Sequence, residues 1–347
     1  MAYAQTVTGR VPAADLGHVL LHEHILSDLR DPATRDTDRA WPPITMQNRF
    51  EIDYFQNRHP PNMWLDDDAA ATADLTALRA AGGRTVVELT VGGLRPQPER
   101  LAAASRASGV HIVCGAGHYV DAYLAPETLA ADRDALADEM RQQLTEGAWG
   151  TAITCGIIGE LGCSWPLTGP ERTRLEAGAD AQRATGAAIT VHPGRHPDAP
   201  AEICAILLAA GADPERVIID HMDRTIFDQA RLVALLRQGF VLEWDMFGIE
   251  TSQYWMPGAD IDLPTDAARI QTLRALTDLG YGAQLAISHD ICTRTRLLTY
   301  GGHGYGHILR HVVPIMLRRG FNEAEVEQLL VHTPARLLAH LTEGDAP

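Results

Sequence analysis

Two histidines separated by a single residue, His22 and His24, are the first side chains of the sequence that could do chemistry. They stand at the end of the apolar run HVLLHEH, which starts at residue 18. Residues two apart in a β-strand point to the same side, and imidazole nitrogens bind zinc and other transition metals. Taken alone, this pair fits two ordinary polar residues as well as it fits a metal site.

Ionisable side chains recur at the ends of four later apolar runs. They are Glu160, His192, His221 and Asp290. Taken singly, each has a structural explanation, such as a strand cap at His192, a hydrogen bond from His221 to a neighbouring aspartate, or a helix cap at Asp290. Together with the first pair they make four imidazoles and two carboxylates, a set that favours a metal centre.

Six ligands are more than one catalytic ion usually takes from a protein. The set therefore predicts two divalent ions bridged by Glu160, with zinc favoured and manganese, iron or cobalt suited to the same ligands. Such a pair would hold a hydroxide between the ions, while one ion polarises the bond to be cleaved. Asp290, a predicted ligand of the same centre, could take the hydroxide's proton as the general base.

The elements that must position these side chains alternate along the chain. Short β-branched or apolar runs begin at residues 18, 85, 111, 155, 187, 217, 240 and 284. Between them lie Ala/Leu/Arg-rich stretches with helical periodicity, such as those from 68, 171 and 228. Strands that alternate with helices indicate parallel βα units, and eight units predict a (β/α)8 TIM barrel with catalytic side chains at the carboxyl ends of its strands. We expect residues 1–347 to form this single domain.

Two segments interrupt the regular alternation. Residues 28–66 separate the first two strands and include the aromatic stretch WPPITMQNRFEIDYFQNRHPPNMW. A connection of this length predicts a long loop insertion, which could act as a lid or as packing. The motif YGGHGYGH from residue 300 lacks the GK[ST] ending of a phosphate-binding loop. We expect a tight turn packed beneath the active site, and the roles of His303 and His307 stay open.

The composition limits the possible partners. A hydrophobic fraction of 46% indicates a large buried core, and 29 Lys and Arg against 45 Asp and Glu give a formal charge of −16. This charge repels nucleic acid and anionic membranes, which leaves a small molecule as the expected partner. The five cysteines form no CxxC pair, and we find no signal peptide and no apolar run of about 18 residues. We therefore expect a cytoplasmic protein without disulfides or membrane contact.

The ordered motifs resemble one known family. They are HEH, GAGHYVDAY, CGIIGELGCSWPLT, VHPGR, DHMDRT, EWDMFGIE, SHDICTRTRL and YGGHGYGHIL. This set resembles the phosphotriesterase family of the amidohydrolase superfamily, in particular its phosphotriesterase-related branch, from about residue 6 to about 340. The resemblance implies a homodimer of (β/α)8 barrels with a binuclear centre built from the same six residues. The namesake enzymes bridge their metals with a carboxylated lysine, whereas the IIGE segment here offers Glu160.

The resemblance also suggests the kind of substrate. Members of the related branch resemble hydrolases of small anionic amides such as N-acetyltaurine, and glutamate-bridged relatives act on sugar-phosphate lactones. Arg195 and Arg224 follow strands five and six and could clamp an anionic group, although each could equally form a salt bridge with a nearby aspartate. Tyr119 of GAGHY matches a tyrosine that faces the metals, and we assign it to substrate positioning, with core packing as the alternative.

Three functions are compatible with these residues and motifs. The favoured one is an amidase for N-acyl amino or sulfonic acids, and the second is a lactonase, including one for sugar-phosphate lactones, or a phosphotriesterase. The third is a catalytically inactive binding protein for small molecules. It is the weakest, because all six predicted ligand positions carry a competent side chain. Amide and ester hydrolysis need the same hydroxide and the same Lewis acid, so the sequence does not separate the first two.

Overall fold

The structure is a computed structural model that describes residues 2–33, 35, 40–251, 254 and 261–340. Residues 34 and 36–39 of the predicted insertion therefore lie outside the described part of the chain. In the described part, no helix is long and apolar enough to cross a membrane.

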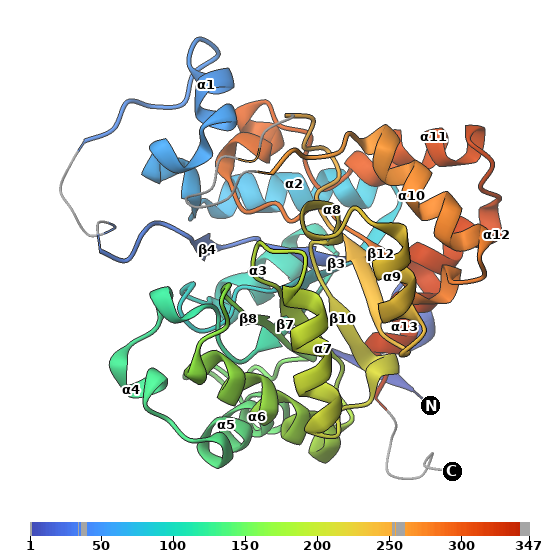
Figure 1. Ribbon diagram of the computed structural model, residues 1–347. Coiled ribbons are helices and arrows are strands. Elements are labelled where there is room, and N and C mark those ends of the chain that lie inside the picture. The colour runs from blue at the N-terminus through green and yellow to red at the C-terminus, as the bar shows by residue number, and fades with distance from the viewer. Residues whose placement is uncertain (1, 34, 36–39, 252–253, 255–260, 341–347) are drawn as a thin grey trace.

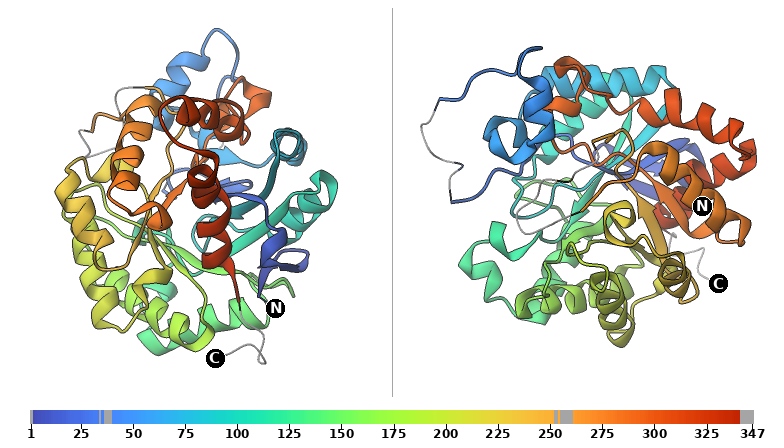
Figure 2. Two further views of the ribbon diagram at one scale, coloured as in Figure 1. Left: turned by 90° about the vertical axis from the view of Figure 1, so that its right-hand side faces the viewer. Right: turned by 45° about the horizontal axis from the view of Figure 1, so that its top comes forward.

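Eight parallel strands form the centre of the molecule (Figures 1 and 2). They are β3 (His18–Glu23), β6 (Gly83–Glu88), β7 (His111–Ala116), β8 (Ile157–Gly162), β9 (Ile189–His192), β10 (Val217–Ile219), β11 (Val241–Trp244) and β12 (Leu285–Ile287). Their order in the sheet is their order in the chain, and each pairs with the next in parallel register. Each lies within one of the eight predicted runs or overlaps it, which confirms the (β/α)8 barrel.

The first and last strands meet through side chains as well as backbone. The Ser288 hydroxyl donates to the carbonyl oxygen of His22 at 2.8 Å, and the Asp290 amide donates to the same oxygen at 3.1 Å. The buried Glu23 carboxylate accepts from the Ser288 hydroxyl and from the His289 amide and ring. These bonds close the barrel between β12 and β3.

Helices surround the strands (Figure 2). The longer ones are α2 (Asp68–Ala80), α3 (Pro98–Ser108), α5 (Arg133–Thr145), α6 (Gly169–Thr185), α7 (Ala199–Ala209), α9 (Gln229–Leu236) and α10 (Asp266–Asp278), and the C-terminal ones are α11 (Val313–Arg318), α12 (Glu323–Glu327) and α13 (Thr333–Leu338). Side chains cap several of them, as at α6, where Thr168 and Glu171 form a reciprocal capping box. The predicted helical stretches from 68, 171 and 228 correspond to α2, α6 and α9.

Alternation along the strands produces two hydrophobic layers. Along β11, Val241 belongs to the apolar cluster inside the barrel, whereas Leu242 and Trp244 belong to the cluster between the strands and the helices. Because successive side chains point to opposite faces, Glu243 and Asp245 continue the inner row towards the carboxyl end. The polar site therefore sits on top of an apolar barrel interior.

The predicted insertion after β3 is folded onto the barrel mouth. It contains α1 (Arg49–Tyr54) and the short pair β4 (Ser27–Asp28) and β5 (Trp64–Leu65), and in Figure 1 it projects at the upper left. The Arg49 guanidinium donates to the carbonyl oxygens of Tyr300 and Thr295 at 2.9 and 2.8 Å. The insertion and the loop after β12 are thus fastened together.

Candidate metal centre

The six predicted side chains lie together at the carboxyl ends of the strands. His22 and Glu160 are on β3 and β8, and His192 ends β9. The other three, His24, His221 and Asp290, lie one to three residues after the ends of β3, β10 and β12. All six residues are buried. The rule that catalytic side chains gather at this end of a barrel therefore predicts their placement correctly.

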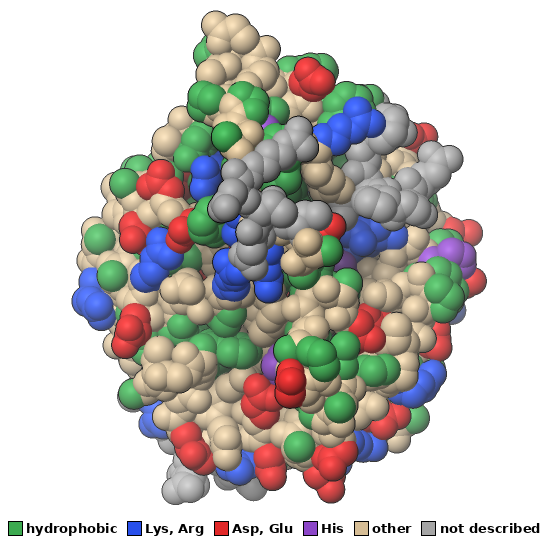
Figure 3. Space-filling view, turned by 90° about the vertical axis from the view of Figure 1, so that its left-hand side faces the viewer, with side chains coloured by type: hydrophobic (Ala, Val, Ile, Leu, Met, Phe, Trp, Pro, Cys, Tyr) green, Lys and Arg blue, Asp and Glu red, His purple; other side chains and the backbone are tan. Residues whose placement is uncertain are grey.

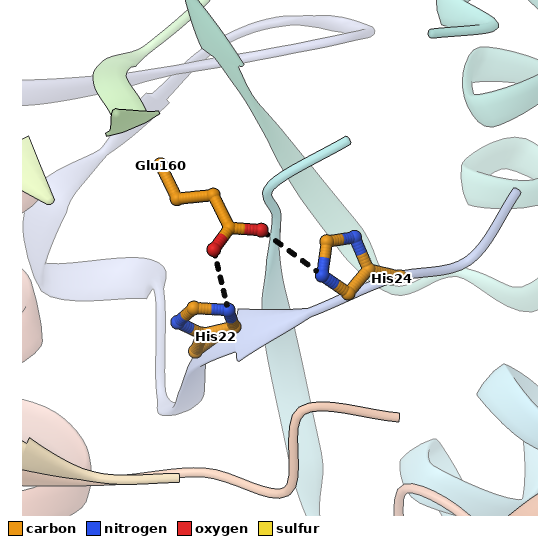
Figure 4. A group of neighbouring side chains, drawn as sticks. All are labelled: His22, His24 and Glu160. Atoms are coloured by element: carbon orange, nitrogen blue, oxygen red, sulfur yellow. Dashed lines mark ion pairs between the residues drawn. The ribbon is translucent and has the colours of Figure 1, made fainter. Parts of the chain in front are cut away.

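Two histidines and two carboxylates form one half of the cluster, and Figure 4 shows three of these residues, His22, His24 and Glu160. Glu160 reaches His24 Nε2 with Oε1 at 3.3 Å and His22 Nε2 with Oε2 at 3.7 Å. Asp290 Oδ1 lies 3.4 Å from His24 Nε2 and 3.9 Å from His22 Nε2. Ligand atoms around a tetrahedral ion with zinc-like bond lengths are roughly 3.4 Å apart, so this group fits a cation. His22 Nε2 makes no hydrogen bond to the described residues, so no protein group competes with such an ion for this nitrogen.

The other half shares the same glutamate. Glu160 Oε2 lies 3.0 Å from His192 Nδ1 and 3.8 Å from His221 Nε2, and the two imidazole nitrogens are 2.8 Å apart. These three residues could hold a second ion. Glu160 therefore stands between two groups, each with two imidazoles.

A further layer of polar side chains orients the imidazoles. The His221 ring presents Nδ1 to Asp245 at 2.7 Å, and the His24 ring presents Nδ1 to the Thr90 hydroxyl at 3.0 Å. Contacts of this kind fix the ring nitrogen that faces a metal. Neither Asp245 nor Thr90 was among the predicted site residues. Asp245 carries a recognisable signal, since it stands near the end of the run FVLEWDM, at the position equivalent to the predicted ligands.

Further acids lie beneath the cluster. Asp220 and Asp245 lie 3.4 and 3.5 Å from His22 Nδ1, and Glu243 joins them in one buried group. Burial raises the pKa of Asp220 to about 6 and that of Glu243 well above its ordinary value. This layer of acids was anticipated only in part. A sequence shows which strand end carries an acid, but it does not show how many acids face one imidazole.

Two members of the cluster have unusual backbone conformations. His221 and Asp290 adopt φ values of 57° and 49°, in the left-handed region that residues with a side chain rarely occupy. Such conformations persist only where the surroundings impose them, and they concentrate at functional sites. Both residues closely follow a barrel strand.

Burial and neighbouring charges set the protonation of each member of the cluster. Burial would lower the pKa of His24, but contacts with Asp290 and Glu160 raise it to about 10. Burial would raise the pKa of Glu160, but the surrounding imidazoles, His192 first, hold it well below its ordinary value. Burial lowers the pKa of His192 to about 4 despite its contact with Glu160, and the Arg224 charge adds to this effect. At neutral pH an ionised Glu160 therefore faces a neutral His192, as metal binding requires.

The three predicted substrate-binding residues border the second half of the cluster. The Tyr119 hydroxyl lies 3.5 Å from His192 Nε2, and Arg224 Nη2 lies 3.2 Å from the same nitrogen. Arg195 approaches the Tyr254 hydroxyl at 3.5 Å. Among the described residues, neither Arg195 nor Arg224 forms the salt bridge considered as its alternative. Asp198 pairs with Arg231 and Asp223 pairs with Arg269.

Known proteins are similar to this chain over nearly its whole length. The model of the phosphotriesterase family matches residues 2–338. An N-acetyltaurine hydrolase of Salmo salar is 41% identical over 341 residues, which are 96% of this chain and 97% of the relative. The chain belongs to the phosphotriesterase family.

Solved structures of similar proteins agree with this assignment. A resiniferatoxin-binding protein from Rhodobacter sphaeroides has a TM-score of 0.90 and 30% identity, over 97% of this chain and 94% of that one. A mutant of a phosphotriesterase-like lactonase from Deinococcus radiodurans has a TM-score of 0.76 and 31% identity, over 96% of this chain and 99% of that one. The chain is thus similar both to hydrolases and to a protein named for binding.

The phosphotriesterase-family barrel has a pocket beside the second half of its cluster. The pocket has a volume of about 750 Å³, and Arg195, Arg224 and Phe227 contribute to its wall. Figure 3 views the molecule from the side of the insertion and shows basic side chains near the centre of this face. Arg195 Nε and Arg224 Nε and Nη1 are buried without a hydrogen-bond partner among the described residues. Unpartnered N–H groups of guanidinium side chains beside a pocket can bind an anion.

Proposed function

We propose that this member of the phosphotriesterase family is a binuclear metal-dependent hydrolase. The observation that carries the proposal is the position of Glu160 between two groups of imidazoles. His22, His24 and Asp290 would hold one ion, and His192 and His221 the other. Bound there, two divalent cations would activate a water molecule and polarise the bond to be cleaved, with zinc favoured over manganese, iron and cobalt.

The bridging role of Glu160 gains support from the whole sequence. The sequence contains 29 arginines and no lysine. A carboxylated lysine, the bridge expected of the namesake enzymes, is therefore impossible within these 347 residues. A glutamate supplies the same two carboxylate oxygens without any prior reaction.

The protein residues have distinct parts in the proposed reaction. The pKa of Asp290 is lowered, because its contacts with the His24 and His22 rings outweigh the effect of burial. An ionised Asp290 at neutral pH can accept a proton as the general base. Tyr119, beside His192, would position the substrate. Arg195 and Arg224 would hold its anionic end in the pocket.

The favoured substrates are N-acyl amino or sulfonic acids such as N-acetyltaurine. The anionic end of such a substrate suits the unpartnered N–H groups of Arg195 and Arg224, and the name of the 41% identical relative supports the amide. A lactonase or phosphotriesterase is the second candidate, supported by the similarity to the Deinococcus radiodurans lactonase. A binding protein without catalysis is the third, supported by the similarity to the Rhodobacter sphaeroides protein.

A parallel turnover screen distinguishes these candidates. Metal-loaded protein is incubated with N-acetyl amino acids, N-acetyltaurine, sugar lactones, sugar-phosphate lactones and paraoxon, and each product is measured. We expect the highest kcat/KM on an N-acyl acid. Turnover of lactones alone would replace the amidase by the second candidate, and no turnover by protein with two bound ions would favour the third.

Assembly, domain organisation and location complete the proposal. We expect a homodimer in the cytoplasm, acting on a small molecule without nucleic acid or membrane, with residues 1–347 as one domain. The charge of −16 and the similarity to the family support these expectations. Sedimentation of the purified protein tests the dimer.

A further inference from the structure

The glycine-rich turn after β12 approaches the barrel more closely than residues with side chains could. A Cβ atom at Gly302 would collide with the backbone of Arg296. A Cβ atom at Gly304, where φ is +65°, would collide with the Asp74 carboxylate. This close approach carries the next residue, Tyr305, into the interior, where it is fully buried.

Tyr305 makes a hydrogen bond to a proposed metal ligand. Its hydroxyl donates to the carbonyl oxygen of His24 at 2.6 Å. Its amide donates to Asp74 at 3.2 Å, and the same carboxylate accepts from the Leu298 amide at 2.7 Å. The tyrosine is therefore fixed at both ends, by α2 at its backbone and by the end of β3 at its hydroxyl.

Arg296 makes the equivalent contact with a second proposed ligand. Its Nη1 donates to the carbonyl oxygen of Asp290 at 2.7 Å, and its Nη2 donates to Gln56 of the insertion at 3.1 Å. Asp290 is one of the two residues of the cluster in the left-handed region. A donor on its carbonyl helps to hold this strained conformation.

The two ligands of the other ion are held differently. The carbonyl oxygen of His192 accepts from the Cys163 amide at 2.9 Å, and that of His221 accepts from the Thr225 hydroxyl at 2.8 Å. These donors come from the residue that follows the neighbouring strand β8 and from the next helical turn. Tyr305 and Arg296 reach only the half of the cluster that contains His24 and Asp290.

We propose that Tyr305 and Arg296 are positioning residues for one ion of the pair. By holding the carbonyl groups of His24 and Asp290, they set the direction in which both side chains enter the site. This inference rests on the proposed binuclear centre. It gives the motif YGGHGYGH a role, since its glycines allow the close approach that brings the Tyr305 hydroxyl to the backbone carbonyl of His24.

The test is stepwise titration of metal-free protein with Co²⁺, followed by its visible absorption, for wild type and Tyr305→Phe. We expect the Co²⁺ affinity of one binding step to fall by ~10–100-fold in the variant and that of the other step to stay unchanged. This is the range for losing a group that orients a metal ligand. Tyr123→Phe is the matched control, because its hydroxyl donates to the carbonyl oxygen of Leu29, outside the cluster, at 3.0 Å. Melting temperatures of the metal-free proteins measure the structural cost of each change.

Each outcome has a definite meaning. Two unchanged binding steps in Tyr305→Phe, or equal weakening of both steps, would overturn the positioning role and leave the binuclear centre standing. Fewer than two binding steps in the wild type would overturn the proposed function and, with it, this inference. If Tyr305→Phe does not fold, Arg296→Lys replaces it, since lysine keeps the charge and loses the fork that joins Asp290 to Gln56.

Discussion

The strand ends and the loops of this barrel mouth contribute different kinds of residue. The strand ends carry the six buried side chains of the cluster, each placed by a paired strand. The connections that follow the strands carry Arg195, Tyr254, the insertion and also Arg224, which lies in the short helix α8 (Met222–Thr225). The contact between Arg195 and Tyr254 is a single hydrogen bond with a ring contact. We therefore expect the proposed metal chemistry to depend on the strand ends, and the selectivity for the substrate to depend on the connections that follow the strands.

The strongest loss is expected at the shared residue of the strand-end cluster. Glu160→Gln should weaken the binding of both ions by more than ~100-fold and abolish turnover, because a neutral amide cannot offset two dications in a buried site. Metal analysis after dialysis measures the loss. Glu171→Gln is the control, since Glu171 is equally buried but caps α6 away from the cluster. Full occupancy of both sites in Glu160→Gln would refute the bridge.

The same bridge should form without carbon dioxide. We expect metal-free wild type to regain full activity when metal is added in carbonate-free buffer, at a rate that bicarbonate does not change. A glutamate needs no carboxylation, and the chain contains no lysine that could undergo it. Faster recovery with bicarbonate would be incompatible with the assignment of Glu160.

The next effect concerns the proposed base. Asp290→Asn should reduce kcat by ~100-fold or more, the range for a lost general acid–base group, and by more if an ion is disturbed as well. Steady-state kinetics are measured together with metal content. A variant with both ions bound and a near-normal rate would remove Asp290 from the role of base.

A stability effect is expected where α2 holds the loop after β12. Burial raises the pKa of Asp74 to about 6, although the Leu298 and Tyr305 amides act in the opposite direction. Because the folded protein then binds a proton more tightly than the unfolded chain, the free energy of unfolding falls as pH rises from about 4 to about 6, by up to ~3 kcal/mol, and is constant above that. Urea unfolding of metal-free wild type and Asp74→Asn measures this, and parallel pH curves for the two would contradict it.

The smallest effect is expected at the loops. Arg224→Met should raise KM about tenfold for an anionic substrate and leave a neutral analogue nearly unaffected, because the variant keeps the apolar stem and loses the charge. Arg195→Met should behave in the same way. Arg231→Met is the matched control, since Arg231 lines the same pocket but pairs with Asp198. Equal losses on charged and neutral substrates would assign both arginines to structure.

The sequence predicted the strand-end region far better than the loops. His22 and His24 could be paired in advance because alternation along a strand is periodic, and the regular βα units place Glu160, His192, His221 and Asp290 at the same rim. The layer of Asp220, Glu243 and Asp245 was only partly visible, because its crowding depends on three strands meeting across the barrel. The contact of Tyr305 with His24 spans 281 positions and depends on the path of a loop, for which no periodic signal exists.

The seam between β12 and β3 has a consequence for folding. Ser288 and His22 lie 266 positions apart, so their bonds form only after almost the whole chain has been synthesised and the other strands have assembled. Because His22 and Asp290 flank this seam, ribosome-bound chains that lack β12 should be unable to complete the metal centre. The amides of His289 and Ile291, which donate to Glu23, are natural reporters of the event. In native-state hydrogen exchange, their protection should appear together and should deepen when metal binds across the closed seam.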